Sequence, residues 1–325
     1  MITREELNKV RTKAGTLKAL VVGDVMLDKY IFGKVDRISP EAPVPILSHQ
    51  KTEMKAGGAA NVALNLAAWG CQTSLTGLVG PDNNSESLKS ILESYNILHK
   101  LIVDESRPTT VKTRVVASSH HLLRIDEESS EYLAGEKEEK AISDIMDFIE
   151  QVQPDLMVIQ DYNKGLLTEN LIERLIHYCQ THKVFLSIDP KEENFFNYSH
   201  ANLFKPNLRE ASLAAQKNLQ FADLPELCKT WLRKMDLGTI AITLGSQGIF
   251  LEDQHNGYHI LPDRSVDVVD VCGAGDAVIC SLSLGLISGL DINKSGALSN
   301  LTGAYVCSHS GVVATNPEEI SNWLT

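Results

Sequence analysis

The stretch DVCGAGDAVICSLSLGLISG (residues 270–289) places two glycines and two acids directly before a long run of small and apolar residues. Gly273 and Gly275, on either side of Ala274, allow successive backbone N–H groups to converge where a helix begins, and the helix dipole favours an anion there. Asp276 would stand beside that anion, where a carboxylate can accept the proton of an attacking hydroxyl group. In the simpler interpretation, Asp276 only caps the helix and the glycines only form a tight turn. The motif alone leaves both interpretations open.

The rest of the chain alternates strand-like apolar runs with segments of helical periodicity. The strand-like runs lie at 18–23, 73–80, 155–160, 184–189, 239–244 and 248–252. The helical segments lie at 59–69, 84–95, 132–152, 169–182, 222–236, 274–289 and 293–308. This alternation predicts an α/β fold with a mostly parallel central sheet and helices on both faces.

Two stretches interrupt this alternation. Residues 30–56 carry three prolines and short alternating strands, and residues 107–126 are rich in β-branched side chains that alternate with polar ones. Both have the pattern of antiparallel strands outside the parallel sheet. We expect a small β-layer, a lid, within a single domain that spans residues 1–325.

Composition and charge limit the class of protein. Of the 325 residues, 43% are hydrophobic and 22% are charged, and no run of 18 apolar residues occurs, which argues against a membrane protein. A net charge of −12 argues against nucleic acid or an anionic membrane as the main partner. It does not exclude anionic small molecules, because local backbone N–H groups, lysines and a metal ion can hold them.

The first segment of the chain and the cysteines bear on the cellular compartment. The first segment, MITREELNKVRTKAG, is polar and predicts a short amphipathic helix rather than an export signal, so we expect a cytoplasmic protein. The six cysteines show no paired or metal-binding spacing and are expected to be buried free thiols. They are Cys71, Cys179, Cys228, Cys272, Cys280 and Cys307.

Polar residues at expected strand ends are candidates for ligand binding, because ligands of open α/β sheets lie beyond the carboxyl ends of the strands. Asp24 directly follows the run KALVVG, and a carboxylate there suits the vicinal hydroxyls of a sugar. Gly57 and Gly58 precede a helix of small residues with Asn61 in its first turn, which allows a ligand to approach the backbone. Turn formation at Asp24 and tight helix packing behind the glycines explain the same residues without a ligand.

Two further motifs have both a functional and a structural interpretation. Asn207 and Glu210 face one side of a helix start, where an amide and a carboxylate can hold a phosphate-linked metal and its waters, or simply form a capping box. Thr243 and Gly245 form a turn between two strands, which a nucleotide could approach or which is only a hairpin. The sequence lacks the GxxxxGK[ST] loop and a GxGxxG after its first strand, and its histidines lack metal-binding spacing.

Taken together, the motifs GGAAN (57–61), NLRE (207–210), TLG (243–245) and GAGD (273–276) resemble the ribokinase family of sugar kinases, also called the PfkB family, over essentially the full chain. The resemblance implies a ribokinase-like fold and an ATP-dependent carbohydrate kinase that uses Mg²⁺. Where the family has DVTGAGDT or a close variant, this chain has Cys272 in place of the threonine and Ala277 after the aspartate.

The resemblance also implies a role for each matching residue. Asp276 would take the proton from the sugar hydroxyl, and the backbone N–H groups of Gly273, Ala274 and Gly275 would stabilise the transferring phosphoryl group. Sugar hydroxyls would be held by Asp24, Gly57, Gly58 and Asn61, and phosphate charges by Lys164 and Lys191. ATP and its magnesium would be bound by Asn207, Glu210, Thr243 and Gly245, with Glu210 contacting the metal through a bound water. Asp270 matches a position that binds a monovalent cation, usually potassium.

Within the family, the segments at 23–47, 57–67, 161–165 and 188–191 resemble the branch that phosphorylates D-glycero-D-manno-heptose 7-phosphate at its anomeric hydroxyl. Kinases of this branch make the 1,7-bisphosphate for ADP-heptose and the lipopolysaccharide core, and many are fused to a nucleotidyltransferase. The chain has no HxGH motif, so we expect a stand-alone kinase. The resemblance also implies a homodimer through the lid strands. A kinase for another sugar, or a sugar-phosphate-binding protein without turnover, remain alternative interpretations.

Overall fold

A nine-stranded sheet forms the centre of the protein. The computed structural model describes residues 2–117, 120–260 and 266–324. Across the sheet the strands follow the order β13-β12-β11-β10-β9-β8-β1-β4-β5. Their bounds are β1 (Lys18–Gly23), β4 (Gln72–Val79), β5 (Leu98–Val103), β8 (Leu156–Gln160), β9 (Phe185–Asp189), β10 (Leu203–Phe204), β11 (Thr239–Thr243), β12 (Ile249–Asp253) and β13 (Gly257–Ile260). All neighbours from β11 to β5 pair in parallel, whereas β12 and β13 join antiparallel at one edge.

Helices cover both faces of this sheet, as expected from the alternation in the sequence. Along β1, Ala19 and Val21 belong to one apolar core, while Leu20 and Val22 belong to the other. The first core is completed by α1 (Arg4–Ala14), α2 (Ala59–Ala68), α3 (Asn83–Ser94), α8 (Ala274–Ile287), α9 (Ile292–Cys307) and α10 (Pro317–Asn322). The second is completed by α4 (Glu136–Val152), α5 (Glu169–His182), α6 (Leu208–Ala214) and α7 (Leu224–Met235). The predicted fold class is confirmed.

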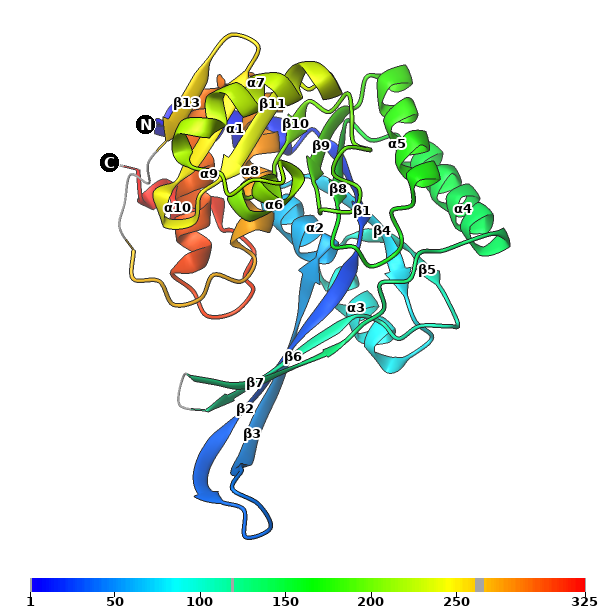
Figure 1. Ribbon diagram of the computed structural model, residues 1–325, viewed down its shortest axis with the longest axis vertical. Helices are drawn as coiled ribbons and strands as arrows, with labels where there is room; N and C mark the ends of the chain where they lie inside the picture. Colours follow the sequence, from blue (N-terminus) through cyan, green and yellow to red (C-terminus); the bar gives the residue numbers. More distant parts are fainter. Residues whose placement is uncertain (1, 118–119, 261–265, 325) are drawn as a thin grey trace.

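A second sheet of four strands extends from the main body as a long arm (Figure 1). Its order is β3-β2-β6-β7, with β2 (Val25–Ile38), β3 (Pro45–Gly58), β6 (Val111–Ala117) and β7 (His120–Glu127). The expectation of purely antiparallel pairing is wrong, because β2 and β6 run parallel. The strands β2 and β6 follow β1 and β5, which point the same way in the main sheet, so both leave it in the same direction. Residues 118–119 of the expected stretch 107–126 lie outside the described residues.

Two local expectations are also corrected. The helix expected from residue 132 begins at Glu136, after Gly135, which has a positive φ of 57°. Cys272 and Cys307 are half-buried rather than buried, while the other four cysteines are buried free thiols as expected. The reason at Cys272 is that the segment before α8 lies at the surface, where Val271 is 67% exposed. Within the described residues, no helix has the length and apolar character needed to cross a membrane.

Gly23 gives a test of the close pairing between β1 and β8. A Cβ atom at this position would lie 2.1 Å from the backbone oxygen of Gln160, and backbone cannot move aside as a side chain can. We expect Gly23→Ala to lower the free energy of unfolding by roughly 1–3 kcal/mol, as overpacking does. Gly15→Ala is the control, because a Cβ there meets its nearest atom at 3.7 Å and φ is −63°. Equal urea unfolding midpoints for the two variants would contradict the prediction.

Candidate active site

The carboxyl ends of four neighbouring strands meet at one edge of the main sheet. Asp24 follows β1, Gln160 ends β8, Asp189 ends β9, and Lys205 follows β10. These strands are adjacent in the sheet, so side chains that are far apart in sequence are brought together at this edge. The helices α2 and α8 pack against each other and begin at the same edge. Most of the candidate residues therefore gather in one place.

Asp276 lies in the first turn of α8 and is only 5% exposed. Its Oδ2 accepts a hydrogen bond from Asn61 Nδ2 at 2.7 Å. Its Oδ1 accepts from the Tyr162 hydroxyl at 3.0 Å and from Gln160 Nε2 at 3.3 Å. Gly273 caps α8 with a φ of 79°, and a Cβ atom at that position would lie 2.7 Å from Asn61 Nδ2. The glycine is thus required both for the left-handed backbone and for the approach of Asn61.

Burial raises the pKa of Asp276 to about 7, with the negative charge of Asp189 adding to the effect. The hydrogen bonds from Asn61 and Tyr162 and the charge of Lys205 act in the opposite direction. A carboxyl group with a pKa near neutrality can take up and release a proton under physiological conditions. The arrangement therefore places a carboxyl group that titrates near neutral pH in the first turn of a helix.

Asp24 is a second buried carboxyl group in the site, with 2% of its surface exposed. Its Oδ2 accepts hydrogen bonds from the backbone N–H groups of Tyr162 at 2.8 Å and Lys164 at 3.0 Å. Its Oδ1 has no hydrogen-bond partner within the described part of the chain. Burial, together with the charge of Asp161, raises the pKa of Asp24 to about 7. An unpaired buried oxygen of this kind is suited to accept a hydrogen bond from a ligand.

Gly57 and Gly58 bring the end of β3 close to Asp28 on β2 and to Asp24, which lies between β1 and β2. A Cβ atom at Gly57 would lie 2.3 Å from Asp28 Oδ2, and one at Gly58 would lie 2.4 Å from the backbone oxygen of Asp24. Gly58 also has a positive φ of 57°. Gly57 is therefore needed for packing against Asp28, and Gly58 for packing against Asp24, whatever the ligand.

Asn207 and Glu210 form the capping box that the simpler interpretation required. The Asn207 side chain accepts from the backbone N–H of Glu210 at 2.9 Å, and Glu210 Oε2 accepts from the backbone N–H of Asn207 at 2.8 Å. Glu210 Oε1 is paired with the Lys191 ammonium. Thr243 joins Asn207 through an isolated parallel bridge, and Gly245, with a φ of 60°, faces open space. The structure thus joins these residues, other than Gly245, into a second cluster.

Two other candidates have partners away from Asp276. The Lys164 ammonium lies 2.9 Å from Glu128 in the loop after β7, although its backbone N–H contacts Asp24. The Asp270 carboxylate accepts from the backbone N–H groups of Cys272 at 3.0 Å and Gly311 at 3.1 Å. Burial disfavours the ionised form of Asp270, but these hydrogen bonds outweigh it, and its pKa is lowered. Asp270 therefore ties the loop before α8 to the segment after α9.

The sequence analysis missed four residues of the site. Gln160, Tyr162 and Asp189 surround Asp276, and Lys205 Nζ lies 2.9 Å from Asp189 Oδ2. Lys205 is 3% exposed, and its Nζ lies 3.8 Å from the Cβ position of Gly275. All four lie at or just beyond strand ends, so the rule that pointed to Asp24 also applied to them.

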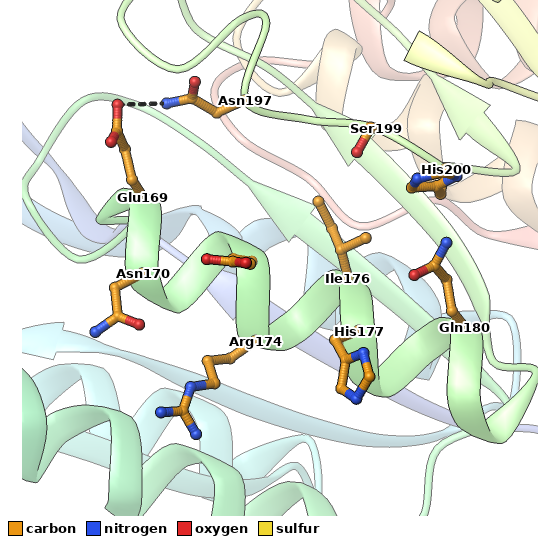
Figure 2. A pocket seen from close by; sticks show the side chains of 10 residues that line it. Glu169, Asn170, Arg174, Ile176, His177, Gln180, Asn197, Ser199 and His200 are labelled. Carbon is orange, nitrogen blue, oxygen red and sulfur yellow. Dashed lines mark hydrogen bonds between the residues drawn. The ribbon is translucent and has the colours of Figure 1, made fainter.

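A separate open groove of about 830 Å³ lies along α5, against the segment 197–200 (Figure 2). Most of its lining residues are polar, and Asn197 donates a hydrogen bond to Glu169 at 3.1 Å. None of the candidate residues lines this groove. The groove is therefore separate from the buried carboxyl groups of the candidate site.

Comparison with known proteins gives a family match over most of the chain. The model of the pfkB family of carbohydrate kinases matches residues 16–319. A protein from Koribacter versatilis named "Bifunctional protein HldE" is 39% identical over 94% of this chain and 63% of its own length. A protein of the same name from Helicobacter hepaticus is 36% identical over 94% of this chain and 64% of its own length. The chain thus spans slightly less than two thirds of the length of these relatives.

Solved structures share the fold. Phosphofructokinase-2 from Escherichia coli, in a crystal structure with potassium, superimposes with a TM-score of 0.77 at 17% identity, covering 95% of this chain and 99% of that chain. Ribokinase from Thermotoga maritima gives a TM-score of 0.69 at 17% identity, covering 95% and 99%. At this level of identity the likeness concerns the fold.

The raised pKa of Asp24 predicts a pH-dependent stability effect. The folded state keeps the Asp24 proton up to about pH 7, whereas the unfolded chain releases it near the usual 3.8, so this contribution to stability is lost as the pH rises through 7. Asp24→Asn removes the buried charge and keeps an acceptor for both N–H groups. We expect it to raise the free energy of unfolding by roughly 1–4 kcal/mol at pH 8.5, and by less at pH 5.

Asp104→Asn is the matched control with the opposite sign. Although Asp104 is buried, hydrogen bonds from Lys137 and Arg107 lower its pKa well below the usual value. Its ionised form therefore stabilises the folded state, and the variant should be less stable than the wild type at both pH values. Thermal unfolding at pH 5 and 8.5 measures both effects. If Asp24→Asn were less stable than the wild type at pH 8.5, the raised pKa of Asp24 would be refuted.

Proposed function

Because the chain belongs to the pfkB family of carbohydrate kinases, we propose that it transfers the γ-phosphoryl group of ATP to the anomeric hydroxyl of D-glycero-D-manno-heptose 7-phosphate. The coarser statement, an enzyme that is a carbohydrate kinase, follows from the family itself. Support for the heptose substrate comes from the resemblance of four segments to that branch and from the 31–39% identity with relatives that share the name "Bifunctional protein HldE". The expectation of a stand-alone kinase stays a prediction.

The observation that carries the mechanism is the buried Asp276 carboxylate at the N-terminus of α8. In the proposed step the anomeric oxygen of the sugar bonds to the γ-phosphorus, the bond from that phosphorus to the ADP oxygen breaks, and Asp276 takes the hydroxyl proton. The backbone N–H groups of Gly273, Ala274 and Gly275 would stabilise negative charge on the transferring group. A base pKa of about 7 suits this role, because the carboxylate must be ionised to accept the proton.

The sugar is proposed to bind between β1 and α2. The unpartnered Oδ1 of Asp24 would accept from a sugar hydroxyl, and Asn61 is held by Asp276 so that its amide lies beside the reacting group. The backbone groups of Gly57 and Gly58, which lie close to Asp28 and Asp24, would contact sugar hydroxyls. Lys164, now paired with Glu128, is the candidate for the distal phosphate.

ATP and magnesium are proposed to lie on the side of α6. Asn207, Glu210, Thr243 and Gly245 would line the nucleotide site, and Lys191 would meet a phosphate charge. Throughout residues 2–117, 120–260 and 266–324, no three His, Cys, Asp or Glu side chains are grouped to hold a metal. Glu210 is already engaged by Lys191 and Asn207, so its carboxylate fits magnesium that is bound by phosphates and held through water. Magnesium would neutralise phosphate charge there.

A potassium ion is proposed near Asp270, which stays ionised because its pKa is lowered. Burial raises the pKa of the neighbouring Cys272 thiol to about 11, so this side chain stays neutral and supplies no charge to a cation. Asp270 and backbone carbonyl groups fit a hard cation better than the thiol does. We also propose that the enzyme acts in the cytoplasm, where ATP is available.

Turnover with defined sugars tests the proposed reaction. ADP release is measured with magnesium ATP and potassium, using heptose 7-phosphate, ribose, fructose 6-phosphate or no sugar. We expect selective turnover with the heptose phosphate, rising with pH through about 7 as Asp276 ionises. Asp276→Asn should bind ATP with near-normal affinity but lose at least 100-fold in kcat, because an amide cannot accept the proton.

The other outcomes separate the alternative interpretations. Turnover with another sugar would keep the mechanism and overturn the substrate. No turnover with any sugar, despite measurable ATP binding, would favour a sugar-phosphate-binding protein. Near-normal turnover by Asp276→Asn would remove this residue as the base.

A homodimer through the second sheet is proposed from exposed apolar side chains on β7. Leu123 is 57% exposed and Ile125 is 46% exposed, and their alternation places both on one face of the strand. We expect light scattering to give twice the chain mass of 35.7 kDa, and Leu123→Lys with Ile125→Lys to give the monomer mass. Leu98→Lys on β5, 51% exposed, is the control that should remain dimeric. A monomeric wild type would refute the proposal.

A further inference from the structure

Tyr162 contacts both carboxylates of the site. It lies two residues beyond the end of β8, where its backbone N–H donates to Asp24 Oδ2 at 2.8 Å. Its side chain turns back so that the hydroxyl donates to Asp276 Oδ1 at 3.0 Å. One residue therefore links the acid proposed to hold the sugar with the acid proposed to act as base.

The ring of Tyr162 also touches the second cluster. The Lys191 ammonium lies 5.1 Å from the centre of this ring, within the range of a cation–π contact, and is paired with Glu210. The ring is thus held between the two parts of the site. Such contacts on both sides limit the rotation of the side chain and keep its hydroxyl directed at Asp276.

The hydroxyl of Tyr162 acts as a donor to Asp276. Burial and the nearby charge of Asp276 raise the pKa of Tyr162 well above its usual value, so the phenol keeps its proton. A hydrogen bond given to a carboxylate favours the ionised form of that carboxylate. It also holds Oδ1, while Asn61 holds Oδ2 at 2.7 Å.

We propose that Tyr162 is a positioning residue for the base: its hydroxyl orients Asp276 and favours the carboxylate form that accepts the substrate proton. This inference rests on the proposed role of Asp276. Gln160 donates to the same oxygen at the longer distance of 3.3 Å and is shared with Asp189, at 3.0 Å. Tyr162 is therefore the stronger of the two donors to Oδ1.

Other groups around Asp276 stay unchanged when this hydroxyl is removed. Asp189 faces Asp276 from the end of β9, and Lys205 faces it from beyond β10, and these two form an ion pair. Cys280 lies on α8 itself, and burial raises the pKa of its thiol well above the usual value, so it stays neutral. Asn61 and Gln160 are neutral amides. A change in the titration of Asp276 in Tyr162→Phe thus reports the lost hydrogen bond.

The test is the pH dependence of kcat for Tyr162→Phe, measured at saturating ATP and with the sugar phosphate that the wild type turns over best. Removing the donor should raise the pKa of the base, so the rising limb of the profile should move up by about one pH unit. At pH 7 kcat should then fall by about 5-fold, and at pH 6, where most of the base is protonated in both proteins, by about 9-fold. The Michaelis constants should change less than twofold, because the backbone N–H to Asp24 remains.

Tyr198→Phe is the matched control. Tyr198 is fully buried, and its hydroxyl donates to another buried acid, Asp161, at 2.7 Å. The variant loses the same kind of hydrogen bond outside the proposed machinery. It should leave the pH profile of kcat in place. An equal shift in both variants would overturn the inference, since a general loss of stability would then explain it.

A second variant tests the same donor without removing it. Incorporating 3-fluorotyrosine at residue 162 makes the phenol a stronger donor and should move the rising limb to lower pH, opposite to Tyr162→Phe. A shift to higher pH, or no shift in either variant, would overturn the inference. Asp276→Asn is measured in parallel: if it keeps normal turnover, the proposed base fails. If it is inactive while both Tyr162 variants are unshifted, only the positioning role fails.

Discussion

The hydrogen bonds to the buried Asp276 carboxylate are the constraint on which the site depends. An ionised carboxylate away from water is costly unless donors surround it. The donors Asn61, Gln160 and Tyr162 come from α2, the end of β8 and the loop after it, far from residue 276 in the chain. The packing of α2 against α8 and the order β9-β8-β1 are needed to bring them together. The proposed base thus exists only in the assembled fold.

The two acids of the site illustrate how function opposes stability. Burial raises the pKa of both Asp24 and Asp276 to about 7, so each makes the folded state less favourable as the pH increases. A surface carboxylate would avoid this effect but would be a weaker base near neutral pH. The packing of α8, a helix of small apolar residues, against α9 and α2 offsets the free-energy cost of burying Asp276.

Two strands of the second sheet, β2 and β3, connect directly to residues of the candidate site. The strand β2 begins one residue after Asp24, and β3 ends at Gly58, directly before α2. Val25 pairs with Gly58, and the backbone N–H of Ala59 donates to the oxygen of Asp24 at 2.9 Å. Any displacement at the base of the arm would therefore reach the proposed sugar site through backbone contacts. This connection explains why both glycines lie at that junction.

The sequence by itself predicted the α/β fold, because strand-like and helical segments alternate along the whole chain. It offered the capping box at Asn207 and the glycine turn before α8 as one of two interpretations each, and the structure contains both, since each depends on backbone preferences within a few residues. It also placed Asp24 at the carboxyl end of a strand, and the structure has Asp24 directly after β1. The tertiary structure alone decided the parallel pairing of β2 with β6, the donors of Asp276, and the pairing of Lys191 with Glu210. These depend on strand order and on side-chain direction at the sheet edge, which no local pattern encodes, because they arise between segments distant in the chain.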